Sequence, residues 1–423
     1  MSIAKKALAG TSLAALLFSG AAYGEDPCSL CPDGGGAPQS RIIIDQIQTG
    51  DLWSSMDVHI ETKATDAAAS ATTVGNTAAG LITTGDLDFD ANQAMHGSVE
   101  AAASVDGANV SGTAFTAATA YGNASTAGTW MGNSQNQSHQ TMTGDVSATS
   151  VIDLNSSANV SASTTGIANV ATTSGEFGDN NAFQTQTSAG SVNANTLASV
   201  GGSSGTAAFV ATASGNTVYS AGHTTTALQG AVQTTAMGER IEGHADIQMG
   251  TTGSAFVATT AAGNSYLLNN EFGYASLGRE GSELYQGNES EVLARTFVDL
   301  GVFSDQAAVS AYGVGNSAAV TNLGSDTALH TIQSNFADVT SQVQFSGVST
   351  TGGVVQVSSI AIGNTASAGL CVTCGQATLQ GTTTQFNSAS ISATGSIQAT
   401  QIGSLTGSAT AIGNSATYQS SGH

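Results

Sequence analysis

A short glycine-rich run matches the G-x-S-x-G pattern of hydrolases that use a serine nucleophile. The run is Gly201-Gly202-Ser203-Ser204-Gly205, and in those enzymes the pattern places the serine on a sharp turn between a strand and a helix. A chain with 52 glycines should contain about one such match by chance, and no strand-to-helix pattern surrounds this one. We therefore expect no catalytic residue and predict that the protein is not an enzyme.

Three aspartates are the nearest approach to a metal site. Asp86, Asp88 and Asp90 alternate with apolar residues, so a strand would carry all three carboxylates on one face, and oxygen ligands of this kind suit calcium. A calcium-binding loop also needs a bidentate acid eleven residues beyond its first ligand, where this chain has Gly97. We expect a solvated acidic face, with calcium as the alternative, and no cofactor.

Histidine and cysteine add no firm metal pattern. The seven histidines occur singly, without an acidic or second histidine partner at metal-ligand spacing, and we expect them on the surface: His59, His96, His139, His223, His244, His330 and His423. The cysteines form two C-x-x-C pairs, Cys28 with Cys31 and Cys371 with Cys374. Such pairs can hold zinc, but in an exported protein they are more often disulfides. The sequence allows either a bridge between the two terminal regions or two local bridges.

The N-terminus has the three parts of a secretory signal peptide. Lys5 and Lys6 precede an apolar run over residues 7–18, and small residues follow at 19–22. Signal peptidase acts on this arrangement, so we predict that residues 1–24 are removed. The apolar run is too short to span a bilayer, and no later stretch approaches the roughly 20 apolar residues that spanning requires. The mature chain is expected to be exported and to have no transmembrane span.

The charge balance excludes some partners and favours others. Asp and Glu number 29 against seven Lys and Arg, and the interval from Lys63 to Arg240 holds no other basic residue. A nucleic-acid partner is excluded, because phosphate contacts need a basic surface, whereas a cationic partner is electrostatically favoured. Residues 339–423 contain no Asp, Glu, Lys or Arg. Such a composition lets like segments stack between molecules; a polar, uncharged end of a solenoid is the alternative.

A repeat of about 48 residues must position all of these side chains. A Gly-Asn dipeptide followed by a small residue recurs along the chain, with Ala168 in place of glycine once. The intervals between the asparagines are 47, 46, 47, 48, 52, 48 and 50 residues. Other Gly-Asn pairs, at 132–133 and 287–288, fall out of phase. The asparagines in phase are Asn76, Asn123, Asn169, Asn216, Asn264, Asn316, Asn364 and Asn414.

Between these asparagines the chain alternates apolar and polar residues, which predicts strands with one buried face. We assign residues 146, 148, 150, 152 and 154 to one such face, and residues 360, 362, 364, 366 and 368 to another. The predicted class is all-β, an elongated β-solenoid or β-helix. Gly and Asn favour turns with positive φ, so the eight asparagines are predicted to stack as a ladder at a turn. With two or three coils per repeat, the array would be on the order of 70 to 100 Å long.

The chain divides into segments by composition. We assign residues 1–24 to the signal peptide and 25–66 to an N-terminal segment with the first C-x-x-C and a β-prone run. This run is expected to cap the first coil, with pairing to the edge of another molecule as the alternative. The acidic repeat region spans 67–338, and the uncharged repeat region spans 339–423. Charge rises over 269–305, where the asparagine spacing lengthens to 52. This stretch is predicted to be an inserted loop, with a displayed binding surface as the functional interpretation.

Several features together resemble one family. The exported start, the early C-x-x-C, the Ala-x-Gly-Asn-Ser/Thr repeats and the uncharged C-terminal region are similar to the holdfast anchor protein D family of alphaproteobacteria. The segments 360–366 and 411–416 also resemble head repeats of trimeric autotransporter adhesins, and residues 177–184 faintly resemble curlin repeats.

The first resemblance implies an outer-surface protein that fixes a polar adhesive polysaccharide, the holdfast, to the cell envelope. It also implies export through a curli-type secretion pore and action beside an amyloid-like anchor partner. We add the hypothesis that the acidic surface attracts deacetylated amino sugars, and we expect self-association. The alternative is a functional-amyloid or surface-layer subunit of a biofilm. A polysaccharide-cleaving β-helix enzyme would need a converging acid, base and aromatic platform, for which 5% aromatic residues offer little material.

Overall fold

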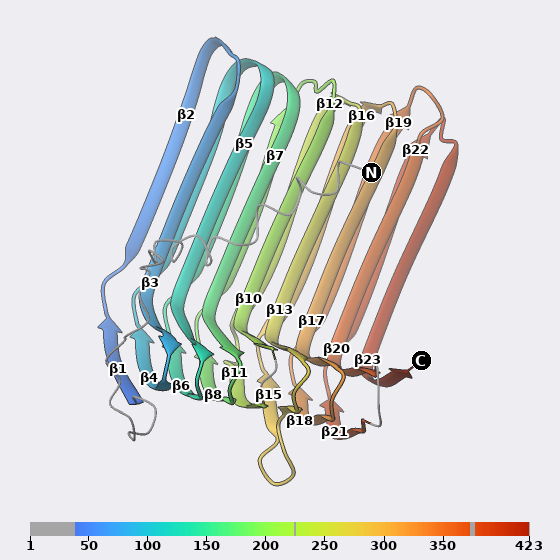
Figure 1. The fold of residues 1–423 in the computed structure, drawn as a ribbon. Coiled ribbons are helices and arrows are strands. Elements are labelled where there is room, and N and C mark those ends of the chain that lie inside the picture. The colour runs from blue at the N-terminus through green and yellow to red at the C-terminus, as the bar shows by residue number, and fades with distance from the viewer. Residues whose placement is uncertain (1–38, 224–225, 373–376, 423) are drawn as a thin grey trace. The chain divides into compact units, whose positions relative to one another are not determined.

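The computed structural model describes residues 39–223, 226–372 and 377–422. In these ranges the chain forms 23 strands and no helix, and neighbouring strands pair in parallel (Figure 1). The described residues therefore offer no helix long and apolar enough to cross a membrane. The predicted all-β solenoid is confirmed. The signal peptide, Cys28, Cys31, Cys374 and His423 lie outside the described residues.

Each coil of the solenoid consists of three segments, which we name the short, middle and long strands. The short strands form a 9-stranded sheet: β1 Gln39–Gln48, β4 Asp86–Met95, β6 Ser134–Met142, β8 Asn180–Ser188, β11 Ala227–Thr235, β14 Ala275–Leu277 with β15 Leu284–Asn288, β18 Thr327–Asn335 and β21 Leu379–Asn387. The middle strands are β2 Leu52–Ala64, β9 Val192–Val200, β12 Arg240–Thr252, β16 Glu291–Phe303, β19 Val339–Ser349 and β22 Ile391–Thr400.

The long strands carry the Gly-Asn repeat. They are β3 Ala67–Thr84, β10 Thr206–His223, β13 Ser254–Glu271, β17 Gln306–Leu323, β20 Val354–Val372 and β23 Ser404–Gly422. Two strands, β5 Val99–Met131 and β7 Val146–Glu176, run through a middle and a long position without a break, which joins these two rows into a 14-stranded sheet. The described chain begins on a short strand and ends on a long one, so it makes eight complete coils.

One repeat makes one coil. Asn76 pairs with Asn123 in the next strand, and Asn216 pairs with both Asn169 and Asn264. The expectation of two or three coils per repeat was wrong, because the strands are long enough for three of them to use the whole period. At about 4.8 Å per coil, eight coils span about 40 Å along the axis.

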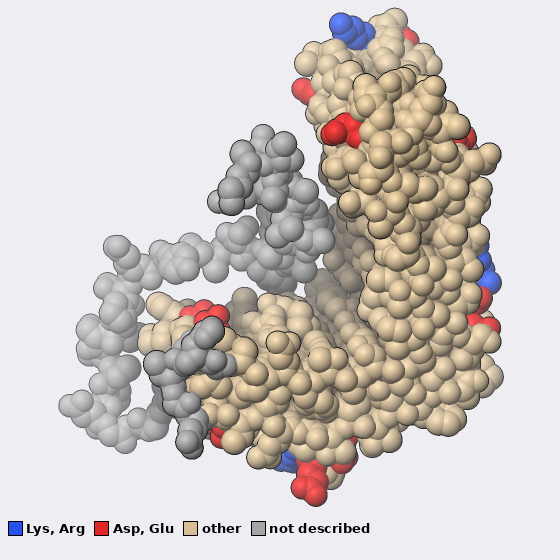
Figure 2. Space-filling model, turned by 90° about the vertical axis from the view of Figure 1, so that its right-hand side faces the viewer, with Lys and Arg blue, Asp and Glu red and all other residues tan. Residues whose placement is uncertain are grey.

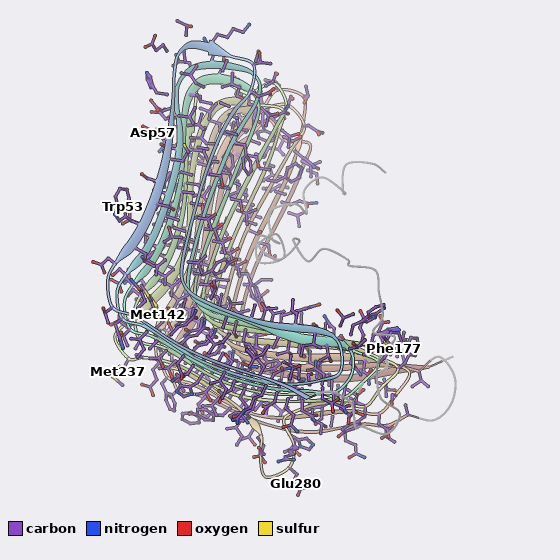
Figure 3. All side chains as sticks on the ribbon, turned by 60° about the vertical axis from the view of Figure 1, so that its left-hand side comes forward. Trp53, Asp57, Met142, Phe177, Met237 and Glu280 are labelled. Atoms are coloured by element: carbon purple, nitrogen blue, oxygen red, sulfur yellow. The ribbon has the colours of Figure 1, made fainter. Side chains whose placement is uncertain are left out.

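Each coil bends at the Gly-Asn dipeptide into two limbs (Figures 2 and 3). In one limb the middle strand packs against the first half of the long strand, as the 2.7 Å contact between Thr259 Oγ1 and Thr296 Oγ1 shows. In the other limb the short strand packs against the second half, where Ser125 Oγ lies 3.0 Å from Ser138 Oγ. The two strand layers of each limb leave room only for small side chains between them, which explains why Ala, Val, Ser and Thr are so common in the interior.

The bend also shifts which residues face inward. Ala213, Ser214, Gly215 and Asn216 are buried in succession, so the alternation of β10 changes phase across the dipeptide. The predicted face from residue 146 to 154 is buried as expected. Ile360 and Ile362, by contrast, are only half-buried, and Ala361 is buried instead. That assignment was wrong because alternation was extended through the bend.

The first strand belongs to the solenoid. β1, which contains the β-prone run, pairs with β4 from Gln39↔Asp86 to Gln48↔Met95 and forms the first rung of the short-strand sheet. Ile42 and Ile44 pack against a core that includes Leu87. The insertion within 269–305 is a narrow loop over residues 278–283, between β14 and β15, and the rest of that stretch lies mostly in strands β13 to β16.

Candidate functional site

The eight asparagines in phase form one continuous ladder at the bend. Nδ2 of each asparagine donates to Oδ1 of the asparagine in the next coil, and the seven distances are 2.7–2.9 Å. Asn123 to Asn364 are fully buried. A buried amide must satisfy two donors and an acceptor, so the stack accounts for one donor and the acceptor of each interior member.

The second proton of each amide ties the long strand to the short one. Asn76 Nδ2 donates to the carbonyl of Ala94, Asn123 Nδ2 to that of Thr141, and the same contact recurs up to Asn364, at 2.7–3.0 Å. Since a carbonyl only accepts, this contact also identifies which amide atom is nitrogen. The ladder therefore has a defined direction, with donors pointing toward the C-terminal coil.

A second ladder of glutamines, which the sequence reasoning missed, runs beside the first. Nε2 of each glutamine donates to Oε1 of the glutamine one coil earlier, at 2.7–2.9 Å. The other proton reaches the carbonyl of the residue after each ladder asparagine, at 2.7–3.0 Å. Its members are Gln46, Gln93, Gln140, Gln186, Gln233, Gln286, Gln333 and Gln385.

The glutamine ladder was readable in the sequence. Its intervals of 47, 47, 46, 47, 53, 47 and 52 residues follow the period of the asparagines. Its direction is opposite, because each glutamine donates to the preceding coil whereas each asparagine donates to the following one. The two ladders lie on facing strands, and their amides connect the long and the short strand at the bend of every coil.

The dipeptides that carry the in-phase asparagines do not form turns. Each of them lies inside a strand, and the positive φ angles of the described residues fall at other positions, such as Phe177, Gly85 and Gly324. The prediction of a turn was wrong. Glycine is needed for space, since a Cβ on Gly75 would lie 2.3 Å from the carbonyl oxygen of Gly122 and 2.9 Å from Met95 Sδ.

The exception at Ala168 follows from its neighbour on the short strand. The short-strand side chains that approach the repeat glycines are Met95, Met142, Thr235, Asn288, Asn335 and Asn387. Register places Ser188 in line with Met142. The short-strand side chain that faces Ala168 is therefore the small Ser188, where Gly122 faces the large Met142. A methyl group at 168 and a small side chain at 188 fill the same space as a hydrogen and a large side chain.

One dipeptide that falls out of phase makes a short ladder of its own. Asn288 Nδ2 donates to Asn335 Oδ1, and Asn335 Nδ2 donates to Asn387 Oδ1, both at 2.8 Å. Thr235 Oγ1 donates to Asn288 Oδ1 at 2.8 Å. These residues end the last short strands, in the row where earlier coils have Met95 and Met142.

The three candidate calcium ligands lie on the outer face of β4. Asp86 Oδ1 accepts the backbone N–H of Asn133 at 2.9 Å, and Asp88 pairs with Arg41 at 3.3 Å. In the described ranges no three His, Cys, Asp or Glu side chains gather closely enough to hold a metal ion. Other aspartates act like Asp86 between coils, for example Asp66, which accepts the N–H of Thr113 at 2.7 Å.

Ser203 and Cys371 occupy ordinary structural positions. Ser203 of the G-x-S-x-G match is buried, and its Oγ donates to the carbonyl of Ala158 at 2.9 Å. Cys371 is exposed near the end of β20, while its sequence partner Cys374 is outside the described residues. The disulfide pairing stays a prediction.

Two histidines have acidic partners in the neighbouring coil that sequence spacing did not reveal. His59 Nδ1 lies 2.6 Å from Asp106 Oδ2, one coil away, and this hydrogen bond and the carboxylate charge raise the pKa of His59. His223 lies 3.0 Å from Glu271. The expectation of isolated histidines was wrong because one coil brings residues 47 or 48 apart side by side.

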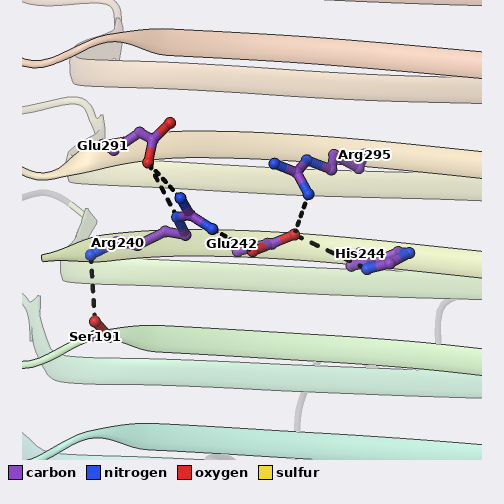
Figure 4. Close-up of polar contacts among 6 residues, drawn as sticks. All are labelled: Ser191, Arg240, Glu242, His244, Glu291 and Arg295. Carbon is purple, nitrogen blue, oxygen red and sulfur yellow. Dashed lines mark hydrogen bonds and ion pairs between the residues drawn. The ribbon is translucent and has the colours of Figure 1, made fainter.

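The densest charge cluster joins β12 and β16 (Figure 4). Arg240 contacts Glu291 through Nη2 at 2.9 Å and Nε at 3.0 Å. Glu242 receives Arg295 at 3.3 Å, Arg240 at 3.7 Å and His244 at 3.9 Å. Positive and negative groups alternate, so the cluster holds neighbouring coils together and presents no unpaired catalytic acid.

Comparison with known proteins gives one match. A family model described as holdfast attachment protein D matches residues 61–338, which is more than half of the 423 residues. The match begins within β2 and ends immediately before β19, so it includes most of both amide ladders. No curated protein and no solved structure matches the chain.

Proposed function

The chain belongs to the holdfast attachment protein D family, and from this premise we propose that it is a non-catalytic protein of the cell surface that anchors the adhesive polysaccharide to the envelope. Family membership itself implies a role in holdfast attachment at the cell surface. The observation that carries the finer proposal is the continuous pair of amide ladders. A body whose coils are all cross-linked by buried hydrogen bonds suits load bearing, since separating two coils would expose unsatisfied amides.

The anchoring proposal is tested by where the adhesive goes when the protein is absent. A strain lacking this chain should synthesise holdfast polysaccharide and shed it into the medium. Complementation with the full chain should restore retention on the cell. A deletion strain that keeps its holdfast on the cell would contradict the proposal.

Charge supports attraction of a cationic polysaccharide, such as a partly deacetylated amino-sugar polymer. Acidic side chains stand out on a largely uncharged surface (Figure 2), and the formal net charge is −22. Exposed charges are screened within about 10 Å at 0.1 M salt. We therefore expect holdfast retention to weaken as ionic strength rises, and retention that does not change with salt would contradict this part of the proposal.

Self-association is favoured by the directions of the two ladders. At the C-terminal end of the described chain, Asn414 accepts from Asn364 and Gln385 donates to Gln333, which leaves an Asn414 donor and a Gln385 acceptor pointing outward. At the other end, Asn76 offers an acceptor and Gln46 a donor. A second copy stacked head to tail would continue both ladders and all three strand rows.

Such a contact is heterologous and repeats indefinitely, so it would build fibres. The C-terminal edge is also weakly guarded, because residues 339–423 lack the charged side chains that usually protect an edge strand. Head-to-tail stacking would therefore also support the alternative function, a subunit of a fibre or of a functional amyloid. The curli-type pore and the amyloid-like partner remain proposals drawn from the resemblance.

Asn414→Asp tests the stacking. Aspartate keeps the oxygen that accepts from Asn364 and replaces the outward donor with a carboxylate that would repel Asn76 of the next copy. We expect high-mass species of the purified mature chain to decrease in sedimentation velocity. Thr382→Asp, an exposed position on the side of the same coil, should leave them unchanged. Equal assembly of wild type and Asn414→Asp would contradict head-to-tail stacking.

A further inference from the structure

The six-residue insertion creates a groove on the outer face of the short-strand sheet. β14 pairs with β11 up to Leu277↔Gln229, and β15 resumes at Tyr285↔Val232. Residues 278–283 leave the sheet between these points, with positive φ at Gly278 and Gly281. Their projection is visible below β15 in Figure 1 and at Glu280 in Figure 3.

The groove has a volume of about 320 Å³. Phe183 and Leu228 contribute apolar surface, and these side chains are 44% and 40% exposed. Gly230 pairs with Phe183 across the strands, and because glycine has no side chain the phenyl ring is uncovered on that side. The loop supplies the opposite wall with Arg279 and Ser282, held by mutual backbone bonds of 3.1 and 2.9 Å.

The polar lining consists of amides, two serines and one guanidinium. Gln135 lies in register with Asn181, and Gln137 with Phe183; each amide can donate and accept. Arg279 donates only, and within the described part of the chain it takes part in none of the ion pairs. No carboxylate lines the groove, although acidic residues outnumber basic ones in the sequence by 29 to 7.

We propose that this groove binds a neutral, N-acetylated sugar residue of a polysaccharide chain. A pyranose ring presents C–H groups to an aromatic face, and its hydroxyls exchange hydrogen bonds with planar amides. The acetamido methyl group fits beside Leu228, and its carbonyl accepts from Arg279. A deacetylated sugar is excluded here, because its ammonium group would face the guanidinium with no carboxylate to offset the repulsion.

The inference rests on the proposed function and refines it. The acidic surface attracts the cationic sugars of the polymer over a distance. The groove binds its neutral sugars by direct contact. The two parts therefore respond differently to salt, because contacts with an apolar floor and neutral amides are not screened.

The test measures binding of defined oligosaccharides to the purified mature chain by isothermal titration calorimetry. The probes are a tetramer of N-acetylglucosamine, its fully deacetylated counterpart and a tetramer of galacturonic acid. We expect the acetylated tetramer to bind in preference to the other two, with little change between low and high salt. Preferential binding of the deacetylated or the acidic tetramer would overturn the assignment.

Gly230→Val is the decisive variant. It fills the groove floor in a strand that already carries Val232 on the same face, and the exposed Phe183 ring can move aside from a Cβ that would lie 3.1 Å from it. We expect at least roughly tenfold weaker binding, equal to about 1.4 kcal/mol, and a similar loss for Phe183→Ala. Thr384→Val, an exposed position on β21 of the same sheet, is the matched control and should bind normally.

The outcomes separate the two proposals. If Gly230→Val folds with an unchanged melting temperature and still binds the acetylated tetramer fully, the groove assignment is wrong, whereas anchoring stands as long as the deletion strain sheds its holdfast. If the deletion strain retains its holdfast, anchoring fails even where the groove binds sugar. Loss of tetramer binding by Gly230→Val, with normal binding by Thr384→Val, supports the groove.

Discussion

At the scale of single residues, the ladder asparagines combine two tasks in one side chain. Asn216 accepts from Asn169 at 2.9 Å and donates to Asn264 and to the carbonyl of Thr234, both at 2.8 Å. If this side chain were removed, water could not take over its hydrogen bonds, because this part of the bend is buried. The side chain joins three consecutive coils and both strands of the bend.

We expect Asn216→Ala to be strongly destabilising. It leaves a donor and two acceptors unsatisfied in the interior, at about 1–3 kcal/mol for each group, so the free energy of unfolding should fall by about 3 kcal/mol or more. Urea denaturation would measure this. Asn216→Asp should be worst at neutral pH and recover partly in acid, because burial raises the pKa of the new carboxyl and protonation removes its charge. A loss below about 0.5 kcal/mol for alanine would contradict the ladder's role.

His59 provides a prediction about pH. Asp106 raises the pKa of His59 through their hydrogen bond and its charge, and Glu61 and Asp57 add to this. Its contribution to stability is present below pH of about 6.5, the unfolded value, and is lost as pH rises through the folded pKa. NMR titration should give a pKa above the ordinary one in wild type and a lower one in Asp106→Asn. Equal pKa values in the two proteins would refute the pair.

At the scale of elements, the bend depends on matching long and short strands. Gly122 faces Met142, whose Sδ would lie 2.5 Å from an added Cβ, and the carbonyl oxygen of Ala168 would be equally close. The next coil uses Ala168 and Ser188 in the equivalent places. The bend thus tolerates alanine when the opposing side chain is small.

Gly122→Ala should cost about 1–3 kcal/mol, the usual range for overpacking. Met142→Ser should also destabilise, because it removes a buried side chain. The double variant should lose less than the sum of the two, since it copies the pairing of Ala168 with Ser188. Thermal unfolding of the four proteins gives the coupling energy. Strict additivity would show that the two positions do not share space.

At the scale of the whole described unit, stability should vary from coil to coil. Interior coils are paired on both sides, whereas the first coil (β1 to β3) and the last coil (β21 to β23) are paired on one side, and the side chains of the last coil are much more exposed. Coils of a solenoid interact mainly with their neighbours. The two terminal coils, and the last coil above all, are therefore expected to open first.

Hydrogen exchange would show this gradient. We expect amides of β10, β13 and β17 to exchange slowest and those of β21 to β23 fastest in the monomer. Head-to-tail assembly should protect the first and last coils selectively, so the same measurement on high-mass species provides an independent check. Uniform exchange across all coils of the monomer would indicate a single cooperative unit instead.

The fold class, the period and the phase of the asparagines could be predicted from the sequence alone, because similar coils place equivalent residues at nearly equal intervals. The sequence also contained the glutamine period, which went unread. That one repeat makes one coil became visible only in the folded chain, since a period does not reveal how many strands it holds. The same is true of the bend. Alternation was extended through Gly363-Asn364 and assigned Ile360 and Ile362 to the wrong face, because a phase change leaves no mark in composition.

The contacts between coils were also decided by the tertiary structure. His59 and Asp106 are 47 residues apart and touch because one turn of the solenoid separates them. The groove beside Phe183 arises from strands β6, β8 and β11 together with a loop that belongs to β14 and β15. No single segment of sequence contains that surface. Local patterns specify strands, whereas the parallel stacking of coils specifies which side chains meet and so where a ligand can bind.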